Sequence, residues 1–403
     1  MGLMPVAEAL SRVLANGKPL PGERVPLADA HGRVLTADLE ALRTQPPADV
    51  SAMDGYAVRA ADVAQVPARL TLIGEAAAGH PFTGTVGAGE AARIFTGGIV
   101  PAGSDTIVIQ ENTRREGNAV VIAASAPKGK HIRREGLDFR RGAVLLARGR
   151  RLSGRDLALA AAMNHSHVWV HRRPRIAVLA TGDELVMPGA PPAMDKIVYS
   201  NGYATMAMAR QEGCEPIDLG IVPDRLRETI EAARRARDAG ADVLVTSGGA
   251  SVGDYDLVHE ALAGEGLALS FWKVALRPGR PLLHGRLGAM HVLGLPGNPV
   301  SSYVCSVLFL LPLIRRLCGR CDIEPVLETA VLGCDLPAND ERTDYLRARL
   351  ADGPTGIPMA TPAPVQDSSM LTPLAGADCL LVREPLAPAA AAGSACRVLR
   401  LPE

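Results

Sequence analysis

The sequence predicts an α/β chain of several domains, built around a doubly wound parallel sheet. Between residues 174 and 319, four short apolar runs alternate with helical stretches. Such alternation is typical of βαβ units, which build parallel sheets with helices on both faces. The flanking segments have short apolar stretches broken by glycine and proline, which favour small β-rich domains. At 403 residues the chain is long enough for two to four domains.

The predicted strands and helices of the central domain follow directly from this alternation. The strands are expected at Arg175–Ala180, Ile217–Ile221, Asp242–Thr246 and His291–Leu295. The helices are expected at Gly202–Glu212, at Asp224–Ala239 and after Pro299. Ser200 and Asn201 are candidate caps for the first helix, and Gly240 is a stop signal for the second.

The whole chain is predicted to divide into five parts. They are an N-terminal helix that packs on the α/β domain (1–20), a linker domain (21–41 with 143–173), a small β-rich domain (42–142), the α/β domain (174–319) and a C-terminal β domain (320–403).

Composition excludes several functional classes. Lys plus Arg is 43 and Asp plus Glu is 43, so the formal charges cancel, and aromatic residues are only 3%. A neutral chain poor in aromatics is a weak candidate for binding nucleic acid or an anionic membrane. The longest apolar run, Val304–Ile314, is shorter than the roughly 18–20 residues of a membrane span. The N-terminus is amphipathic and has no long apolar core of a signal peptide, so we expect a cytoplasmic protein.

The seven cysteines are expected to be reduced thiols. Their number is odd and they are scattered along the chain. Cys318 and Cys321 form one C-x-x-C pair, for which a metal or redox role is the minor alternative, because further ligands at compatible spacing are not evident.

Three polar loops follow three of the predicted strands. They are Thr181–Leu185, Ser247–Asp256 and Pro296–Ser301. Ligands of parallel sheets bind at the carboxyl ends of the strands, so the three loops are expected to meet at one edge. The glycines of the second loop allow the backbone N–H groups to approach a phosphate, although a tight turn alone would also explain them.

Charged residues near these loops suggest an anion and a cation. Lys273, Arg277 and Arg280 lie within eight residues and predict an anion partner, with a solvated basic loop as the alternative. Carboxylates beside glycine or at element boundaries could hold Mg²⁺, although each alone is more often a turn or cap residue. They are Asp54, Asp138, Glu184, Asp224, Asp254 and Asp256. The motifs of P-loop NTPases, zincins, α/β-hydrolases and Rossmann dehydrogenases are absent from the sequence.

Six motifs, spread over nearly the whole chain, carry a resemblance to a known family. They are Ser51–Ala57 (SAMDGYA), Arg93–Gly98 (RIFTGG), Glu135–Asp138 (EGLD), Thr181–Leu185 (TGDEL), Ser247–Gly253 (SGGASVG) and Leu295–Pro299 (LPGNP). In this combination the chain resembles the MoeA family of molybdopterin molybdenumtransferases, homologous to the E domain of gephyrin and its plant counterpart. The Ser-Gly-Gly loop alone is shared more widely, with the MogA/MoaB-like fold expected for the central domain.

The resemblance implies a role in molybdenum cofactor biosynthesis. The family inserts molybdate into adenylylated molybdopterin and releases AMP, assisted by a divalent cation that is usually Mg²⁺. It implies catalytic roles for Asp54, Thr96, Asp138, Glu184, Lys273 and Arg277. It implies a metal set of Asp54, Glu184, Asp224 and Asp256. Where the family often has lysine, this chain has Arg277 and Arg280, and a guanidinium is not equivalent to an ammonium.

The resemblance also implies a set of substrate-binding residues. They are Asp224, Ser247, Gly248, Gly249, Ser251, Gly253, Asp256, Pro296, Gly297, Asn298, Arg347 and Ser368. Family members are homodimers, so the linker domain is expected to dimerise and the Asp54 domain of one subunit to complete the site of the other. A molybdopterin adenylyltransferase and molybdoenzymes or their chaperones are possible partners. Two other functions stay open: molybdopterin adenylyltransferase, and a gephyrin-like scaffold without catalysis. Tungstate and molybdate are not distinguished by the sequence.

Overall fold

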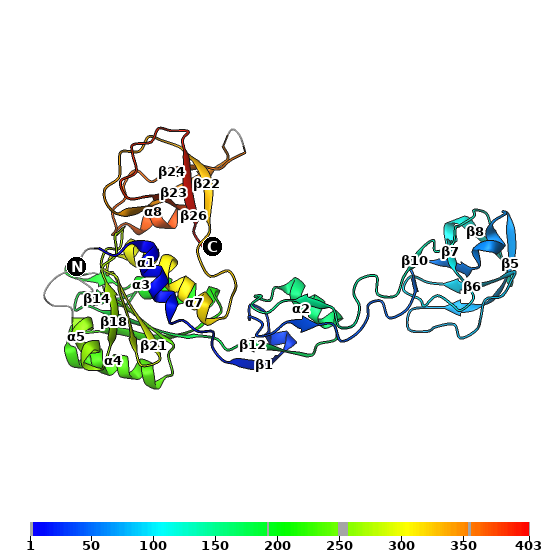
Figure 1. Cartoon of the computed structure of the whole chain (residues 1–403), viewed down its shortest axis with the longest axis horizontal. Helices are drawn as coiled ribbons and strands as arrows, with labels where there is room; N and C mark the ends of the chain where they lie inside the picture. The colour runs from blue at the N-terminus through cyan, green and yellow to red at the C-terminus, as the bar shows by residue number, and fades with distance from the viewer. Residues whose placement is uncertain (1–2, 192, 249–256, 354–355, 403) are drawn as a thin grey trace.

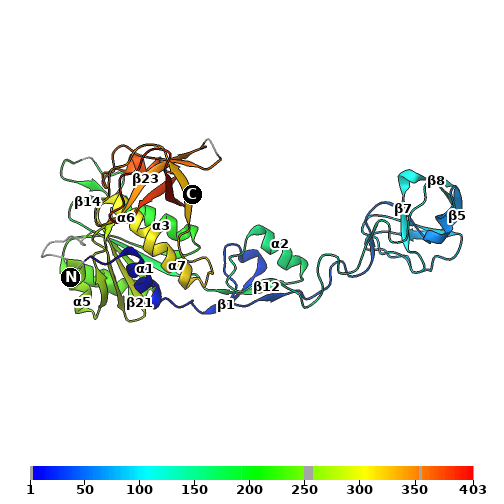
Figure 2. The ribbon, with the colours of Figure 1, turned by 45° about the horizontal axis from the view of Figure 1, so that its top comes forward.

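A computed structural model shows an elongated protein built from four parts (Figure 1). The structure describes residues 3–191, 193–248, 257–353 and 356–402. At one end, an α/β domain packs beside the C-terminal domain. A slender linker module connects this end to an outer β module at the far end of the molecule, and the turned view gives the same arrangement (Figure 2).

The central sheet of the α/β domain has the strand order β16-β13-β17-β21-β20-β18. Its strands are β13 (Arg175–Thr181), β16 (Glu215–Val222), β17 (Val243–Ser247), β18 (Ala268–Trp272), β20 (Leu283–Leu287) and β21 (Met290–Leu295). β13, β16, β17 and β21 run parallel to one another, as predicted. Along β13, Ile176 and Val178 join one core while Ala177 and Leu179 join another, so the sheet is buried on both faces.

One edge of the sheet differs from the prediction of a parallel sheet. β20 pairs antiparallel with β21, and β18 pairs antiparallel with β20. The sequence pattern did not indicate β20, because His284 and Arg286 interrupt its short apolar run. Because β18 is antiparallel to β20 and β20 is antiparallel to β21, β18 runs in the same direction as β21. Both strands therefore end at the same edge of the sheet.

Helices cover both faces of the sheet. They are α1 (Val6–Ala15), α3 (Asn201–Gln211), α4 (Leu226–Asp238), α5 (Leu257–Gly264) and a continuous stretch of α6 (Pro299–Cys305), the π-helical turn η4 (Ser306–Leu310) and α7 (Leu311–Leu317). α4 buries Ala232, Ala233 and Ala236, which recur at helical spacing. Ala9 and Val13 of α1 join the same core as the stretch from α6 to α7.

The stretch Pro299–Leu317 is long and apolar enough to cross a membrane by length and composition alone. However, 83% of its most apolar window is buried inside the protein, and core helices of globular proteins meet the same criterion. Pro312 lies just after the wider π turn. A proline inside a regular helix removes one hydrogen bond and clashes with the carbonyl four residues earlier, so the π turn accommodates it.

The linker and outer modules are mostly β structure. The linker module consists of β1 (Gly22–Pro26), β2 (Leu39–Glu40), β11 (Val144–Leu146), α2 (Gly154–Ala162), β12 (His167–His171) and the 3-10 turn η1 (Leu27–Asp29). The outer module consists of β3 (Val50–Ser51), β4 (Gly55–Val58), β5 (Ala68–Ala76), β6 (Glu90–Ile94), β7 (Thr106–Ile109), β8 (Thr113–Glu116), β9 (Ala119–Ile122), β10 (Ile132–Arg133) and the 3-10 turns η2 (Ala60–Val63) and η3 (Gln110–Asn112). Each module has its own buried apolar cluster.

The C-terminal domain is a six-stranded sheet with one short helix, and it receives its first strand from the loop after β18. Its elements are β19 (Leu276–Arg277), β22 (Leu327–Leu332), β23 (Thr343–Ala351), β24 (Met359–Pro362), α8 (Leu371–Ala375), β25 (Cys379–Arg383) and β26 (Ala395–Arg400). All seven cysteines of the chain are free thiols.

Candidate functional site

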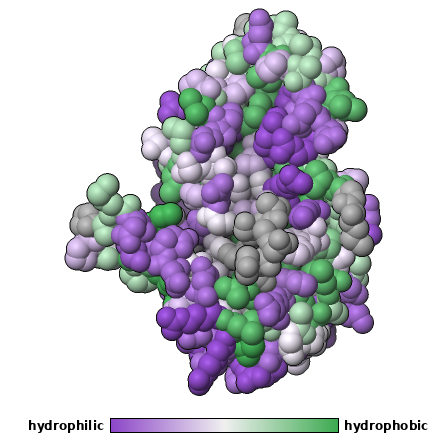
Figure 3. All heavy atoms as spheres, turned by 90° about the vertical axis from the view of Figure 1, so that its left-hand side faces the viewer, coloured by the Kyte–Doolittle hydropathy of each residue, from purple (hydrophilic) through white to green (hydrophobic). Residues whose placement is uncertain are grey.

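The carboxyl ends of the central strands form one continuous edge. Thr181 is in register with Val222, and Ser247 is in register with both Ala180 and Leu295. This register places the starts of the loops at 181–185, 247–248 and 296–301 side by side. The prediction that three polar loops meet at one edge is therefore confirmed for the described residues. Figure 3 faces this end of the molecule and shows hydrophilic side chains distributed over both the α/β and C-terminal domains.

A pocket of about 80 Å³ lies at this edge. Glu184, Ser247, Gly248 and Gly297 line it, together with the short pair β14 (Leu185–Val186) and β15 (Ile197–Val198) and the first residues of α3. Gly248 has a φ of +94°, and a Cβ there would lie 2.3 Å from the carbonyl oxygen of Thr181. Only glycine fits this position, so the backbone can line the pocket directly. Gly249, Ser251, Gly253, Asp254 and Asp256 lie outside the described residues.

Two further carboxylates, those of Asp183 and Asp224, lie close to Glu184, which lines the pocket. The backbone N–H of Asp224 donates to Oδ1 of Asp183 over 3.3 Å. The pKa of Asp224 is raised, first because its carboxylate is partly shielded from water and second because the negatively charged Glu184 lies nearby. A cluster of carboxylates that repel one another favours a cation.

Glu184 and Asp224 fit a Mg²⁺ ion only in part. Within the described parts of the chain, no three His, Cys, Asp or Glu side chains are grouped so that they could hold a metal ion. Mg²⁺ is commonly held by one or two carboxylates together with water and substrate phosphates, so a complete protein cage is not required. Two carboxylates beside a phosphate-sized pocket satisfy that pattern.

Lys273 reaches the same edge from the end of β18. Its backbone N–H donates to the carbonyl of Leu282, and its ammonium lies 5.6 Å from the ring centre of Trp272. Its φ is +94°, a conformation that is strained for a residue with a side chain. Strain of this kind is concentrated at functional sites. The catalytic role of Lys273 stays a prediction.

Arg277 has partners within the chain. Its guanidinium donates to Asp344 and, over 3.0 Å, to Oδ2 of Asp340. The hydrogen bond that Arg277 donates to Asp344 is the main reason why the pKa of Arg277 is raised. The sequence predicted that an external anion neutralises this cation, but the C-terminal domain supplies two carboxylates that do so. The structure therefore does not bring Lys273 and Arg277 together as a free cationic pair.

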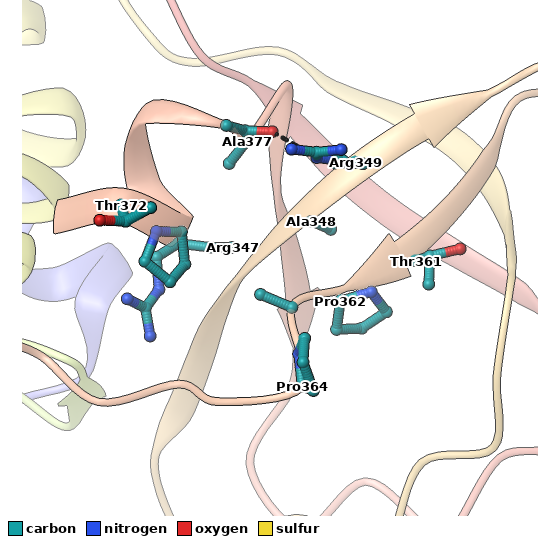
Figure 4. A pocket seen from close by; sticks show the side chains of 11 residues that line it. Arg347, Ala348, Arg349, Thr361, Pro362, Pro364, Thr372 and Ala377 are labelled. Carbon is teal, nitrogen blue, oxygen red and sulfur yellow. Dashed lines mark hydrogen bonds between the residues drawn. The ribbon is translucent and has the colours of Figure 1, made fainter. Parts of the chain in front are cut away.

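Arg347 is only 1% exposed and also has partners within the chain. It donates to Oε1 of Gln366 over 3.2 Å and to the carbonyl oxygens of Val365 and Met370. Figure 4 shows it beside Thr372, in a pocket of about 410 Å³ that Arg349 also lines. Burial lowers the pKa of Arg347, since its bonds go to neutral oxygens.

Asn298 and Ser368 are in direct contact across the domain boundary. Nδ2 of Asn298 donates to Oγ of Ser368 over 2.8 Å. Pro296 is buried at the base of the same loop. The structure thus joins two predicted substrate-binding residues that are 70 positions apart in the sequence.

Asp54 and Thr96 form a second, separate group in the outer module. Oδ1 of Asp54 accepts hydrogen bonds from the backbone N–H of Thr96 over 2.7 Å and from its hydroxyl over 2.8 Å. These two bonds, the backbone one first, lower the pKa of Asp54. Asp138 is exposed where the outer module joins the linker, and its N–H donates to the carbonyl of Gln45. Within one chain, the outer module that carries Asp54 and Thr96 lies at the opposite end from β14, which begins directly after Glu184 (Figure 1).

Asn201 is a site residue that the sequence did not identify. It was a candidate helix cap together with Ser200, but Ser200 makes no side-chain cap bond. The side chain of Asn201 contacts two of the pocket loops instead. An asparagine at a helix start looks the same in the sequence whether it caps the helix or binds neighbouring loops. Its position next to a predicted loop was therefore the only available signal.

Three family descriptions match the chain in order. They are "MoeA N-terminal region (domain I and II)" over residues 4–164, "Probable molybdopterin binding domain" over 177–316 and "MoeA C-terminal region (domain IV)" over 329–401. The fold and these matches define the class, a multidomain protein of molybdenum cofactor biosynthesis.

Individual relatives agree with this class. A molybdopterin molybdenumtransferase of Nostoc sp. is 40% identical over 344 residues, covering 82% of this chain and 78% of the relative. One of Bacillus subtilis is 34% identical over 387 residues, covering 94% and 90%. The crystal structure of the molybdopterin biosynthesis MoeA protein of Pyrococcus horikoshii is 29% identical, covers all of both chains and has a TM-score of 0.85. The chain belongs to the MoeA family.

Proposed function

We propose that this chain is a molybdopterin molybdenumtransferase that inserts molybdate into adenylylated molybdopterin with Mg²⁺-dependent release of AMP. The main support is the edge of the central sheet. Along that edge lie a phosphate-sized pocket, two mutually repelling carboxylates and, at the end of β18, a strained lysine. A phosphoanhydride is cleaved by neutralising charge, and this group of residues has the required chemistry. The printed names of the relatives give the same activity for those proteins.

Each side chain has a role that follows from its charge and place. Glu184 and Asp224 hold the Mg²⁺ ion, which supplies Lewis-acid stabilisation of phosphate charge when bound. Lys273 neutralises the developing charge on the leaving AMP or on molybdate, which is a dianion. The N–H of Gly248 and the hydroxyl of Ser247 face the phosphates. No protein nucleophile is needed, because water can attack the phosphoanhydride to release AMP. The two dithiolene sulfurs replace oxygen ligands of molybdate, which take up the thiol protons and leave as water.

The outer module is proposed to complete the site of a second subunit in a homodimer. Asp54 is a carboxylate already oriented by two hydrogen bonds in the outer module, whereas around Glu184 the described residues supply no complete set of metal ligands. Apolar side chains are exposed beside both groups, at Met53 and Ile99 and at Ile197 and Val198, which is what a contact between subunits would cover. We further propose a cytoplasmic location and transfer of the product to molybdoenzymes or their chaperones.

The decisive experiment measures AMP release from adenylylated molybdopterin, with and without molybdate and Mg²⁺. Release that requires both, with molybdenum-loaded pterin as product, is the expected result. Lys273→Ala should abolish it, while Lys128→Ala, which removes an exposed lysine of the outer module, should not. ATP-dependent adenylylation of the pterin would indicate an adenylyltransferase instead. Saturable pterin binding without release would indicate a scaffold.

A further inference from the structure

Asn201 connects two loops of the pocket through a single amide group. Its Nδ2 donates to Oγ of Ser247 over 2.7 Å and to the carbonyl oxygen of Gly297 over 2.8 Å. A carbonyl oxygen can only accept a hydrogen bond, so the amide nitrogen must face Gly297, and the orientation of the side chain is fixed. Both protons of the amide are thereby used.

The hydrogen bond from Asn201 to Ser247 determines whether the Ser247 hydroxyl acts as a donor or as an acceptor toward a ligand. Because its oxygen accepts from Asn201, its proton is available for another acceptor. Ser247 is only 4% exposed and lines the pocket at the end of β17. Phosphate oxygens only accept hydrogen bonds, so a serine held in this way is a matched donor for them.

The second bond extends the connection to the C-terminal domain. Gly297 is followed by Asn298, which donates to Oγ of Ser368, and the N–H of Val300 donates to the carbonyl of Ser368 over 3.0 Å. Hydrogen bonds therefore run from the loop after β17, through Asn201 and the loop after β21, to Ser368.

We infer that Asn201 is a positioning residue, which orients Ser247 as a hydrogen-bond donor to a phosphate oxygen of the substrate and holds the loop of Gly297 in register with Ser368. The part that concerns the phosphate rests on the proposed function. The part that concerns the two loops does not, because it follows from hydrogen bonds within the chain.

The test compares Asn201→Asp with Asn201→Ala in the AMP-release assay. Aspartate has nearly the same shape but accepts the Ser247 proton, repels the Gly297 carbonyl and places a negative charge beside the phosphate. We expect kcat/KM to fall about 10-fold for Asn201→Ala and about 100-fold or more for Asn201→Asp. A purely structural asparagine would give the reverse order. Asn118→Asp makes the same chemical change on the exposed turn between β8 and β9 and should leave kcat/KM unchanged.

A second arm removes the hydroxyl. In a Ser247→Ala background, the gap in kcat/KM between Asn201→Asp and Asn201→Ala should shrink at least about threefold, because no hydroxyl remains to be turned and only the repulsion of the Gly297 carbonyl and of the phosphate is left. A difference as large as in the parent would overturn the role assigned to Ser247.

The last arm does not depend on activity. Hydrogen exchange of the folded protein should be faster in Asn201→Ala across residues 293–302 and 365–370, and unchanged in the outer module. Equal exchange in parent and variant would overturn the connection between the loops. If the parent releases no AMP but the exchange result holds, the proposed function has failed and the loop connection stands.

Discussion

The two carboxylate groups of this protein, one in the outer module and one in the α/β domain, are built in opposite ways. Asp54 accepts two hydrogen bonds from one residue, Thr96, and its pKa is lowered. Asp224 lies beside Glu184 and Asp183, and its pKa is raised. The first carboxylate is stabilised as an anion before any ligand arrives. The second is less favourable as an anion until a cation binds.

This difference suggests a division of labour. A carboxylate whose charge is already balanced by fixed donors can orient a ligand with its remaining oxygen. A crowded pair holds a cation tightly, because binding relieves the repulsion. Joined in a dimer, the two groups would offer one oriented oxygen and one cation site to the same substrate.

The strongest challenge to the comparison is Asp54→Ala. We expect a loss of AMP release of about 100-fold or more, because an oriented carboxylate cannot be replaced by water. The thermal unfolding midpoint should fall only slightly, since the variant loses two hydrogen bonds at the module surface but no core contact. Asp62→Ala removes another carboxylate of the same module and should retain full activity. Full activity of Asp54→Ala would remove the outer module from the site.

Mixing inactive variants tests whether the two groups act in different subunits. Asp54→Ala and Glu184→Ala chains, unfolded and refolded together, should recover about a quarter of the parent activity, because half of the dimers are mixed and each has one intact site. Each variant refolded alone should stay inactive. No recovery, with mixed dimers demonstrated by mass spectrometry, would mean that both groups serve one chain.

Thr96→Val removes the hydroxyl donor and leaves the backbone N–H. The pKa of Asp54 should rise toward its ordinary value, because one of two stabilising bonds is lost. AMP release should fall about 10-fold, a smaller effect than that of Asp54→Ala. The pKa can be followed by NMR of the Asp54 carboxyl carbon. Thr113→Val, which removes a hydroxyl bonded to a backbone carbonyl in the same module, is the control.

The smallest effect is expected from Asp224→Asn without Mg²⁺. An aspartate whose pKa is raised by folding stabilises the protein only while it is protonated, and that stability is lost as the pH rises through its folded pKa. At pH 7.5 the variant should therefore unfold about 2 °C higher than the parent, and this gain should vanish below the ordinary pKa of aspartate. With Mg²⁺ bound, the parent should unfold at a higher temperature than the variant. If Asp224→Asn instead had a lower unfolding midpoint than the parent at pH 7.5 without Mg²⁺, the proposed repulsion between Asp224 and Glu184 would be contradicted.

The edge of the central sheet could be predicted because it depends on local patterns. Apolar runs, helical spacing and glycine-rich loops are all read within about 20 residues, and the parallel topology then brings the loops together. The antiparallel ribbon of β20 and β18 escaped prediction, since His284 and Arg286 obscure its apolar pattern.

Pairings over long distances were less accessible. Arg277 has its partners at Asp340 and Asp344, which are 63 and 67 residues away, and no local pattern indicates which carboxylate will meet a cation. Asn201 was hidden for a related reason. At the start of a helix, asparagine is favoured as a cap, so its bonds to loops 46 and 96 residues away leave no separate trace in the sequence.

The pairing of β2 with β11 has a consequence for how this architecture can be altered. Leu39 faces Leu146 across two antiparallel strands, so the chain leaves for the outer module and returns from it at neighbouring points. A turn of a few residues could therefore close the gap and replace about a hundred residues. The outer module is an insertion that extends the reach of the protein without interrupting the sheet that forms the pocket. Lengthening or shortening the connection between the linker module and the outer module would change the position of Asp54. It would leave the residues of the pocket in the α/β domain unchanged.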